Sequence, residues 1–518
     1  MLPKHNPQFA EKSYYKWIVL VISVMASFMA ILDVNIVIVA LPKMMAVFGV
    51  NVVTIDWVMI AFTITYSIVI LLTIYASRKY GLKKSFIISV LVFTAGSAVC
   101  GLAPTYKILV LSRIVQGIGG AGLIPISLNL IAKYFRLEER GTAMGAWNIG
   151  IMVAPAIGPM LGGYFVDYVD WRWIFYFNVP VGILLVISTM IFLENDIPPK
   201  KFNKKFDFIG FILISIFLGT LIYVLNEGQT LEWNSGIIRI NELISGVSLL
   251  LFIIYELMTS RHLMDYSLFK SNNFITGNIV SIIRAAGIFS TLFLLPIFIQ
   301  NVMNYNAMHA GFLMVPFAIA VAVSSPVVGK LSDKFGPRYF LALGMLFFGF
   351  SNFLLGNISL QTTVNFIIYD QFLRGLGVGF INAPVMMAVI NSPPKPEQIP
   401  DASAMYNVIF QLGASFGVAF VGEELAVRQA YHLTQYARDV KYNFYPYKHI
   451  INVFSSGLTK NGGSVFRSFH SNSLRMFDYF VNIHSEIAAF GDIFYMMGYL
   501  FIGGAVIALL VGNAGSKK

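Results

Sequence analysis

A single carboxylate, Asp33, lies deep in the first long apolar run of the chain, which extends from about residue 17 to residue 39. An ionised carboxylate is costly in hydrocarbon, so a residue of this kind usually has a function. Low-dielectric surroundings make a carboxyl group bind its proton more tightly than water does, and a nearby cation or water releases that proton. Asp33 is therefore predicted to bind and release a proton. A structural carboxylate paired with a buried cation is the alternative.

An arginine near one end of the fourth apolar run could supply such a cation. Arg113 begins a short motif in which Gln116 and Gly117 follow it. A guanidinium beside Asp33 favours the ionised carboxylate, and protonation of the carboxylate would release the pair. We therefore expect Asp33 and Arg113 to act as a proton-dependent switch. An arginine bonded only to backbone carbonyls is the alternative.

The fifth apolar run combines small residues with proline. Small residues let two helices approach closely, whereas proline removes a backbone hydrogen bond and bends a helix. Such a helix suits a protein that rocks between two open states, although close packing alone would also explain the pattern. The residues concerned are Pro155, Gly158, Pro159, Gly162 and Gly163.

Two short loops between apolar runs resemble each other. The first contains Arg78 and Gly81, and the second contains Asp333, Gly336 and Arg338. An aspartate in this position can cap a helix and pair with a neighbouring cation. We interpret both loops as latches that close the cytoplasmic face. The alternative is that their basic residues only set the orientation of the chain in the membrane.

Further polar side chains interrupt other apolar runs. Arg284 is the most isolated of them and should face a cavity or a carboxylate, with Asp370 as a candidate partner. These residues are predicted to contribute to a cavity or a charge pair: Asn35, Arg284, Asp370 and Arg374.

The composition places all these residues in an all-α membrane protein. Of the 518 residues, 57% are hydrophobic and only 12% are charged, about half the usual charged share of soluble proteins. About 14 apolar runs are long enough to span a bilayer, and their length favours helices over a β-barrel. The net charge of +11 is explained by basic cytoplasmic loops, so we expect no nucleic-acid partner.

An internal repeat organises the expected helices. Residues 77–83 line up with 332–338, and Gly117-Ile-Gly119 lines up with Gly375-Leu-Gly377. Two six-helix bundles plus two inserted helices are therefore expected, with a cavity between the bundles. The expected parts are a cytoplasmic N-terminus (1–16), an N-terminal bundle (17–194), the inserted helices with their loops (195–274), a C-terminal bundle (275–513) and a cytoplasmic tail (514–518).

The distribution of basic residues predicts that both termini are cytoplasmic, because basic residues gather in alternate loops beginning with the first cytoplasmic one. One external segment, 426–490, is long and polar, and its ends look helical. A long loop crosses the membrane regardless of its charge. It is either a solvated loop or a docking surface for a partner.

Jointly, these motifs resemble the major facilitator superfamily, and within it the 14-helix drug:proton antiporters of the Emr and Qac types. The resemblance covers nearly the whole chain. It rests on Asp33 followed by Ala40-Leu41-Pro42, on Arg113 with Gln116 and Gly117, on the glycine and proline motif of the fifth run, and on Trp171-Arg172-Trp173 with Asn178-Val179-Pro180.

The resemblance implies a secondary transporter of the inner membrane that exports lipophilic drugs or other small amphipathic compounds in exchange for protons. Two features, a basic Ser77-Arg78 and the long external segment, are similar to the Emr-type subgroup. That subgroup implies a periplasmic adaptor protein and an outer-membrane channel in a Gram-negative host. A dedicated exporter of one metabolite, siderophore or lipid is the alternative, because one fold hosts many cargoes.

Other function classes find little support in the residues. No nucleophile–base pair is apparent, so we do not expect an enzyme. The seven histidines do not cluster at metal-ligand spacing, and no phosphate-binding GxxxxGK[ST] motif is present. We therefore expect neither a metal nor another cofactor, and we expect a proton gradient to drive transport.

Overall fold

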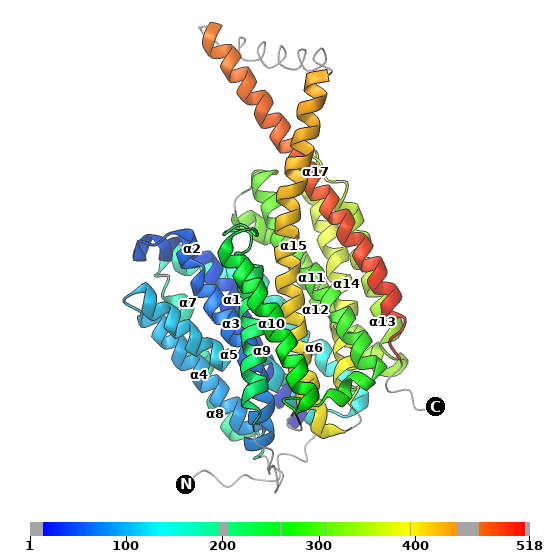
Figure 1. Ribbon diagram of the computed structural model, residues 1–518. Coiled ribbons are helices and arrows are strands. Elements are labelled where there is room, and N and C mark those ends of the chain that lie inside the picture. Colours follow the sequence, from blue (N-terminus) through cyan, green and yellow to red (C-terminus); the bar gives the residue numbers. More distant parts are fainter. Residues whose placement is uncertain are drawn as a thin grey trace.

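The computed structural model describes residues 14–195, 206–259, 262–305, 307–393, 395–442 and 466–512. Fourteen helices within these ranges are long and apolar enough to cross a membrane, which confirms the predicted all-α membrane fold. The long helices form one bundle (Figure 1). We call the end at which α1 begins and α17 ends the terminal end, and we call the opposite end the hairpin end.

The N-terminal half has six long helices and three short ones. The long helices are α1 (Tyr15–Phe48), α3 (Trp57–Tyr80), α4 (Leu82–Leu102), α5 (Tyr106–Tyr134), α6 (Arg140–Tyr168) and α8 (Asn178–Phe192). The short ones are α2 (Val52–Ile55), η2 (Leu137–Glu139) and α7 (Trp173–Tyr176). The inserted pair, α9 (Phe208–Glu227) and α10 (Gly236–Met258), follows them.

The C-terminal half also has six long helices. They are α11 (Asn272–Asn301), α12 (Ala307–Phe335), α13 (Arg338–Leu355), α14 (Val364–Ile390), α15 (Ile399–Tyr442) and α17 (Phe466–Ala508). Two 3₁₀ turns, η3 (Tyr266–Lys270) and η4 (Pro396–Gln398), precede α11 and α15.

The two halves repeat one packing scheme. In the first, α5 packs against α3 and α4 while α1 packs against α6; in the second, α14 packs against α12 and α13 while α11 packs against α15. The starts of α5 and α14 are also capped in the same way. The Thr105 side chain accepts a hydrogen bond from the backbone N–H of Ile108, and the Thr363 side chain accepts one from the backbone N–H of Phe366. The helices of one half therefore hold positions equivalent to those of the other.

Reciprocal helix pairs join the halves. α6 packs against α12, and α3 packs against α15, so each half contributes the same two positions to the contact. The α6–α12 contact is tightest near the terminal end, where a Cβ added at Gly329 would clash with the carbonyl oxygen of Gly141 and one at Gly141 with that of Gly329. The inserted helix α9 lies against α10, α3 and α15 and so touches both halves.

Helices α15 and α17 are longer than any single span requires. They contain 44 and 43 residues, against roughly 20 for a membrane crossing. Their far ends project beyond the other helices (Figure 1). The predicted external loop 426–490 is thus helical where it is described, because 426–442 continue α15 and 466–490 belong to α17. Its middle, 443–465, lies outside the described residues, as do 1–13 and 513–518.

Candidate functional site

The centre of the N-terminal half contains a fully buried ion pair. The Asp33 side chain of α1 and the Arg113 side chain of α5 have no exposed surface, and Arg113 Nη1 lies 2.5 Å from Asp33 Oδ2. The structure therefore brings together the two charged residues that the sequence suggested could pair. Taking two charges out of water is unfavourable unless both are well bonded, so their remaining contacts decide the chemistry of the site.

The second carboxylate oxygen of Asp33 accepts two hydrogen bonds from amide groups. Gln116 Nε2 donates to Oδ1 at 2.7 Å, and Asn178 Nδ2 donates to the same atom at 2.8 Å. Ser97 Oγ accepts a further bond from each amide, at 3.2 and 3.1 Å. The carboxylate thus bonds α1 directly to α5 and α8, and Ser97 of α4 accepts from the same two amides. A change in the charge of Asp33 therefore alters contacts between these helices.

Arg113 keeps several partners besides Asp33. Its Nε donates to the carbonyl of Val58 in α3 at 3.0 Å, and its Nη1 donates to Gln116 Oε1 at 2.8 Å. The guanidinium carbon lies 4.2 Å from the centre of the Phe62 ring. These contacts would hold the cation in place when Asp33 is protonated, because none of them depends on the carboxylate.

Sequence reasoning missed two members of this site, Ser97 and Asn178. Asn178 follows the short helix α7 and begins α8, and it was noticed only as part of a family motif. A buried amide at the start of an apolar run is a usable signal, because such a group must find a partner. Ser97 gives no comparable signal, since a serine in a membrane helix can bond its own backbone.

Gly117 contributes to the site through packing. A Cβ added there would lie 2.9 Å from the carbonyl oxygen of Phe62, so the glycine lets α5 approach α3. Gly375 in α14 holds the equivalent position, since a Cβ on it would clash with the carbonyl oxygen of Phe317 in α12. The repeated glycines therefore set how deeply the charged positions of α5 and α14 are buried.

The glycine motif of α6 faces α1 close to Asp33. A Cβ added at Gly158 would lie 2.8 Å from Cβ of Asn35, and one at Gly162 would lie 3.0 Å from the carbonyl oxygen of Ile36, whereas nothing lies within 4 Å of such an atom at Gly163. α6 is continuous through Pro155 and Pro159. Asn35 does not join the carboxylate site, because its Nδ2 donates to the Ile31 carbonyl of its own helix at 2.7 Å.

In the second of the two loops interpreted as latches, Asp333 lies at the end of α12. Its carboxylate accepts hydrogen bonds from the backbone N–H groups of Gly141 and Thr142, at 2.7 and 2.9 Å, and from the Thr142 hydroxyl at 2.9 Å. Asp333 therefore caps the start of α6, in the other half of the molecule. A negative charge at a helix start is stabilising because the exposed N–H groups there are unpaired.

The first of these loops, which contains Arg78, makes the equivalent contact between α3 and α15, with the charges arranged differently. Arg78 at the end of α3 lies 2.6 Å from Asp401 at the start of α15, and it also donates to the Glu397 carbonyl at 3.1 Å. Asp401 was not identified from the sequence. Both latch helices end at a glycine with positive φ, 86° at Gly81 and 82° at Gly336.

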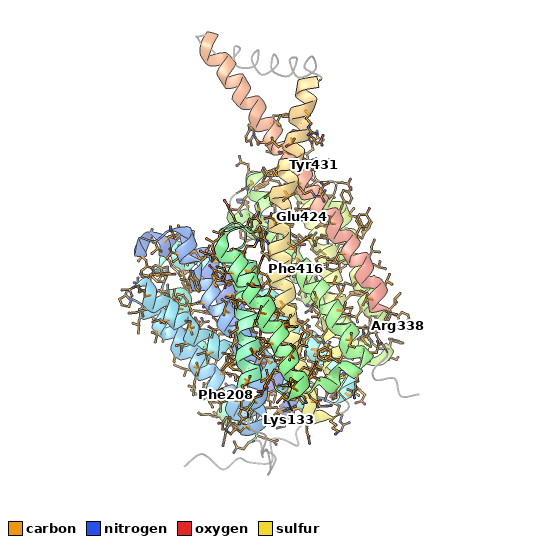
Figure 2. All side chains as sticks on the ribbon, in the orientation of Figure 1. Lys133, Phe208, Arg338, Phe416, Glu424 and Tyr431 are labelled. Atoms are coloured by element: carbon orange, nitrogen blue, oxygen red, sulfur yellow. The ribbon has the colours of Figure 1, made fainter. Side chains whose placement is uncertain are left out.

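Arg338 follows the second of these glycines. It begins α13, and it has no ion-pair partner within the described residues. In Figure 2 its label lies beside α13 in the C-terminal half. The latch role predicted for Arg338 is therefore not supported by a contact between the halves.

Asp370, the candidate partner of Arg284, does not contact it in the structure. Asp370 lies one helical turn from Arg374 in α14, where the two charges are 3.3 Å apart, and the Ser351 hydroxyl donates to it at 2.7 Å. Arg284 instead donates to Asn382 and Tyr406, which are neutral. The depth of Arg284 and Asp370 along their helices follows from the sequence, but the rotation of α11 against α14 does not, and that rotation decides the partner.

Comparison with known proteins agrees with this architecture. The family model of the Major Facilitator Superfamily matches residues 24–418. The chain belongs to this superfamily. It is therefore a multi-pass membrane transporter of small molecules rather than an enzyme, as the sequence motifs predicted.

Individual relatives match most of the chain. It is 31% identical to the probable multidrug resistance protein EmrY of Escherichia coli, over 81% of this chain and 82% of that protein. It is 28% identical to the multidrug export protein EmrB of Haemophilus influenzae, over 85% of each. Among solved structures, the proton:xylose symporter XylE has a TM-score of 0.59 at 14% identity over 95% of each chain, which supports the fold.

Proposed function

We propose that the protein is a proton-coupled antiporter that exports lipophilic drugs or other small amphipathic compounds by alternating access. The observation that carries this proposal is the buried site at Asp33, where one carboxylate bonds α1 to both α5 and α8. The names of the similar exporters EmrY and EmrB support a drug-like cargo. The proton gradient, rather than a cofactor, would supply the energy.

Protonation of Asp33 is the proposed driving step. When the carboxylate takes up a proton it becomes neutral, and its attraction to Arg113 is lost, while Arg113 keeps its bonds to Val58 and Gln116. A neutral carboxyl group can accept fewer strong hydrogen bonds, so the contacts to Gln116 and Asn178 also weaken. Release of the proton on the opposite side of the membrane restores all of them.

Helix α6 is positioned to transmit this change to the latches. Its glycines pack against α1 just beyond Asp33, and its first residues are capped by Asp333 of the other half. A shift of α1 relative to α6 would therefore change the contact between the start of α6 and Asp333 of α12, which closes the terminal end. We propose that Gln116, Gly117 and the α6 motif of Pro155, Gly158, Pro159, Gly162 and Gly163 serve this coupling.

The proposed orientation places the terminal end in the cytoplasm and the hairpin end outside, in an inner membrane. Basic residues at the terminal end support it, because cytoplasmic loops carry an excess of lysine and arginine; Figure 2 shows Lys133 there and Tyr431 at the hairpin end. The projecting parts of α15 and α17 suit a docking element for a periplasmic adaptor protein that leads to an outer-membrane channel.

The proposal is tested in proteoliposomes with an imposed pH gradient and no ATP. The neutral lipophilic dye N-phenyl-1-naphthylamine reports uphill movement without adding a charge of its own. We expect uphill movement by the wild type and none by Asp33→Asn, with equal dye binding by both. Uphill movement by Asp33→Asn would remove Asp33 from the mechanism, and the absence of proton-driven movement for every dye tested with folded wild type would remove the antiporter proposal.

A further inference from the structure

The side-chain amide of Asn178 is bonded at one end only. Asn178 begins α8 and is 1% exposed. Its Nδ2 donates to Asp33 Oδ1 at 2.8 Å and to Ser97 Oγ at 3.1 Å. Its Oδ1 is buried and has no hydrogen-bond partner among the described residues. A buried oxygen without a donor is unfavourable, so a state of the site in which a donor reaches this oxygen would relieve that cost.

The second amide at the carboxylate, that of Gln116, is bonded at both ends. Its Oε1 accepts from Arg113 Nη1 at 2.8 Å, and its Nε2 donates to Asp33 Oδ1 at 2.7 Å. A guanidinium can only donate hydrogen bonds, so the oxygen of Gln116 must face Arg113 in every charge state of Asp33. Asn178 is not held in this way, because nothing bonds its oxygen. Of the two amides, Asn178 is therefore the one that can reverse.

The contacts of the two carboxylate oxygens determine where a proton on Asp33 would lie. Oδ2 is 2.5 Å from Arg113 Nη1, a group that cannot accept a hydrogen bond. Oδ1 faces the two amides, and of these only Asn178 can turn an acceptor toward it. The proton is therefore expected on Oδ1. There it needs a hydrogen-bond acceptor at the place where the ionised carboxylate has a donor.

We propose that the Asn178 amide reverses when Asp33 takes up its proton, so that Asn178 Oδ1 accepts a hydrogen bond from the protonated Oδ1 of Asp33. This inference rests on the proposed proton coupling and adds a positioning residue to it. The reversal exchanges one unpaired end of the amide for the other, so it leaves no additional end of the amide without a partner. Asn178 thereby stabilises ionised Asp33 as a donor and neutral Asp33 as an acceptor.

Ser97 carries the change to the helix that precedes Asn178. In the ionised state Ser97 Oγ accepts from both amides and donates to the Phe175 carbonyl of α7 at 2.9 Å. Reversal brings the oxygen of Asn178 to Ser97, and the hydroxyl then turns from Phe175 to that oxygen. The bond that joins α4 to α7 is lost as a result. Protonation of a residue in α1 thus changes a contact between two other helices.

The other groups that contact the site leave Asp33 as the group whose charge the reversal follows. α5 contributes the Arg113 guanidinium, and α4 contributes the Cys100 thiol, which donates to Gln116 Oε1 at 3.6 Å and so bonds the amide that stays fixed. α3 contributes a backbone carbonyl and an aromatic ring, both to Arg113. α6 faces this part of α1 with glycines.

Infrared difference spectra of the full protein in lipid nanodiscs test the reversal. The pH is lowered stepwise, and a carboxyl C=O band that is missing in Asp33→Asn marks protonation of Asp33. The amide C=O of Asn178 has no hydrogen bond before protonation and accepts one afterwards, which lowers its stretching frequency. We expect a paired loss and gain in the amide C=O region that titrates together with the Asp33 carboxyl band. An Asp33 carboxyl band without this amide pair would overturn the proposal.

Two serine variants assign the amide pair. Asn178→Ser removes the amide and should abolish the pair while the Asp33 carboxyl band remains. Asn352→Ser is the matched control, because Asn352 is also buried with an unpaired Oδ1, but its Nδ2 donates to the Phe348 carbonyl of its own helix at 2.8 Å. It should leave the pair unchanged. Persistence of the pair in Asn178→Ser, or its loss in Asn352→Ser, would contradict the assignment.

A labelled wild type keeps the test independent of whether Asn178→Ser folds. Asparagine that carries ¹³C at its side-chain carbonyl is incorporated, which lowers the frequency of every asparagine C=O and leaves that of Gln116 unchanged. Both members of the amide pair should then move to lower frequency. A pair that does not move would belong to another amide and would contradict the role of Asn178.

The same spectra separate this inference from the proposed function. If the Asp33 carboxyl band appears without the amide pair, Asp33 takes up a proton and only the role of Asn178 fails. If no carboxyl band depends on Asp33 at any pH at which the protein stays folded, the proposed proton coupling fails, and the inference that rests on it fails as well.

Discussion

The two halves of the molecule place different charges at equivalent positions of the same fold. In α5 the order is Arg113 and then Gln116, ahead of Gly117; in α14 the order is Gln371 and then Arg374, ahead of Gly375. The helices, their glycines and their threonine caps are shared, yet the arginine and the glutamine have exchanged places. The comparison shows that the repeat preserves packing while the buried charges are free to diverge.

The carboxylates of the two halves differ in the same way. Asp33 comes from a separate helix and receives two amide hydrogen bonds in addition to Arg113. Asp370 comes from the same helix as Arg374 and receives one hydroxyl hydrogen bond, from Ser351. A change in the charge of Asp33 therefore alters contacts between helices, whereas a change in the charge of Asp370 alters mainly the contact within one turn of α14. We accordingly assign the proposed coupling to the N-terminal half.

The largest expected difference between the halves is in uphill transport. Asp33→Asn should abolish it, because the side chain no longer gains or loses a proton. Asp370→Asn should retain proton-driven transport, if with a less stable protein. Both are compared in proteoliposomes with the neutral dye. Loss of coupling in Asp370→Asn with a normal melting temperature would contradict the division of roles.

Removing the arginine of each pair should destabilise the protein more in the C-terminal half than in the N-terminal half, which is the opposite of the ranking expected for transport. Arg374→Gln leaves Asp370 with one hydrogen bond, and breaking such a buried pair costs about 3–5 kcal/mol. Arg113→Gln should cost less, because Asp33 keeps two amide donors. Thermal unfolding in detergent measures the difference, and the double variant Asp370→Asn with Arg374→Gln should recover part of it. An equal loss in both single variants would show that the amides do not matter.

The α6–α12 contact tests whether the halves move against each other. A Cβ at Gly329 would clash with the Gly141 carbonyl, whereas nothing lies within 4 Å of one at Gly246 on the inserted helix α10. Overpacking should cost the closed terminal end about 1–3 kcal/mol in Gly329→Ala and nothing in Gly246→Ala. Labelling of an engineered cysteine near the terminal end reports opening. Identical labelling of the two variants would argue against this contact as a closing surface.

The latches should stabilise the closed terminal end less than the α6–α12 packing does. Asp333→Ala removes a helix cap, which is worth roughly 1 kcal/mol and at most about 2 kcal/mol. The equilibrium should shift toward an open terminal end by roughly 5- to 30-fold. Arg78→Ala, which breaks the other latch, should act in the same direction. If either variant stabilised the closed state by the same labelling assay, the latch interpretation would be wrong.

The smallest expected effect concerns the linker between the inserted pair and the C-terminal half. Burial alone would raise the pKa of Asp265, but hydrogen bonds from Gln398 and Ser267, with the charge of Arg78, lower its pKa to about 2. A lowered pKa stabilises the fold above the ordinary carboxyl range near pH 4, and this contribution is lost as the pH falls toward 2. Asp265→Asn should remove that part of the acid sensitivity in unfolding measurements. If the Asp265→Asn variant lost stability with falling pH as the wild type does, Asp265 would not make this contribution.

The sequence predicted the fold and the first charged pair because both depend on depth in the membrane. A carboxylate and a guanidinium in different apolar helices must find partners, and Asp33 and Arg113 are the obvious candidates in the N-terminal half. The fourteen apolar runs and the internal repeat could also be recognised from the sequence. These features need no knowledge of how one helix is rotated against another.

What the sequence did not show depends on that rotation. Asn382 and Tyr406 lie beside Arg284 only because α14 and α15 present those faces to α11, so the sequence favoured the wrong partner, Asp370. Asp401 looked like an ordinary residue at a helix start, yet it receives Arg78 from the other half. The helical ends of the external segment were expected from the sequence, but the length to which α15 continues, as far as Tyr442, was not.

Proton release on cargo binding tests the central claim most directly. Purified protein in a weakly buffered solution between about pH 6 and 8 is mixed with the neutral dye, and the change in pH is recorded. Exchange at Asp33 predicts the release of up to about one proton per molecule by the wild type and by Asp370→Asn, and none by Asp33→Asn. Equal release by Asp33→Asn and the wild type would show that the coupled proton resides elsewhere.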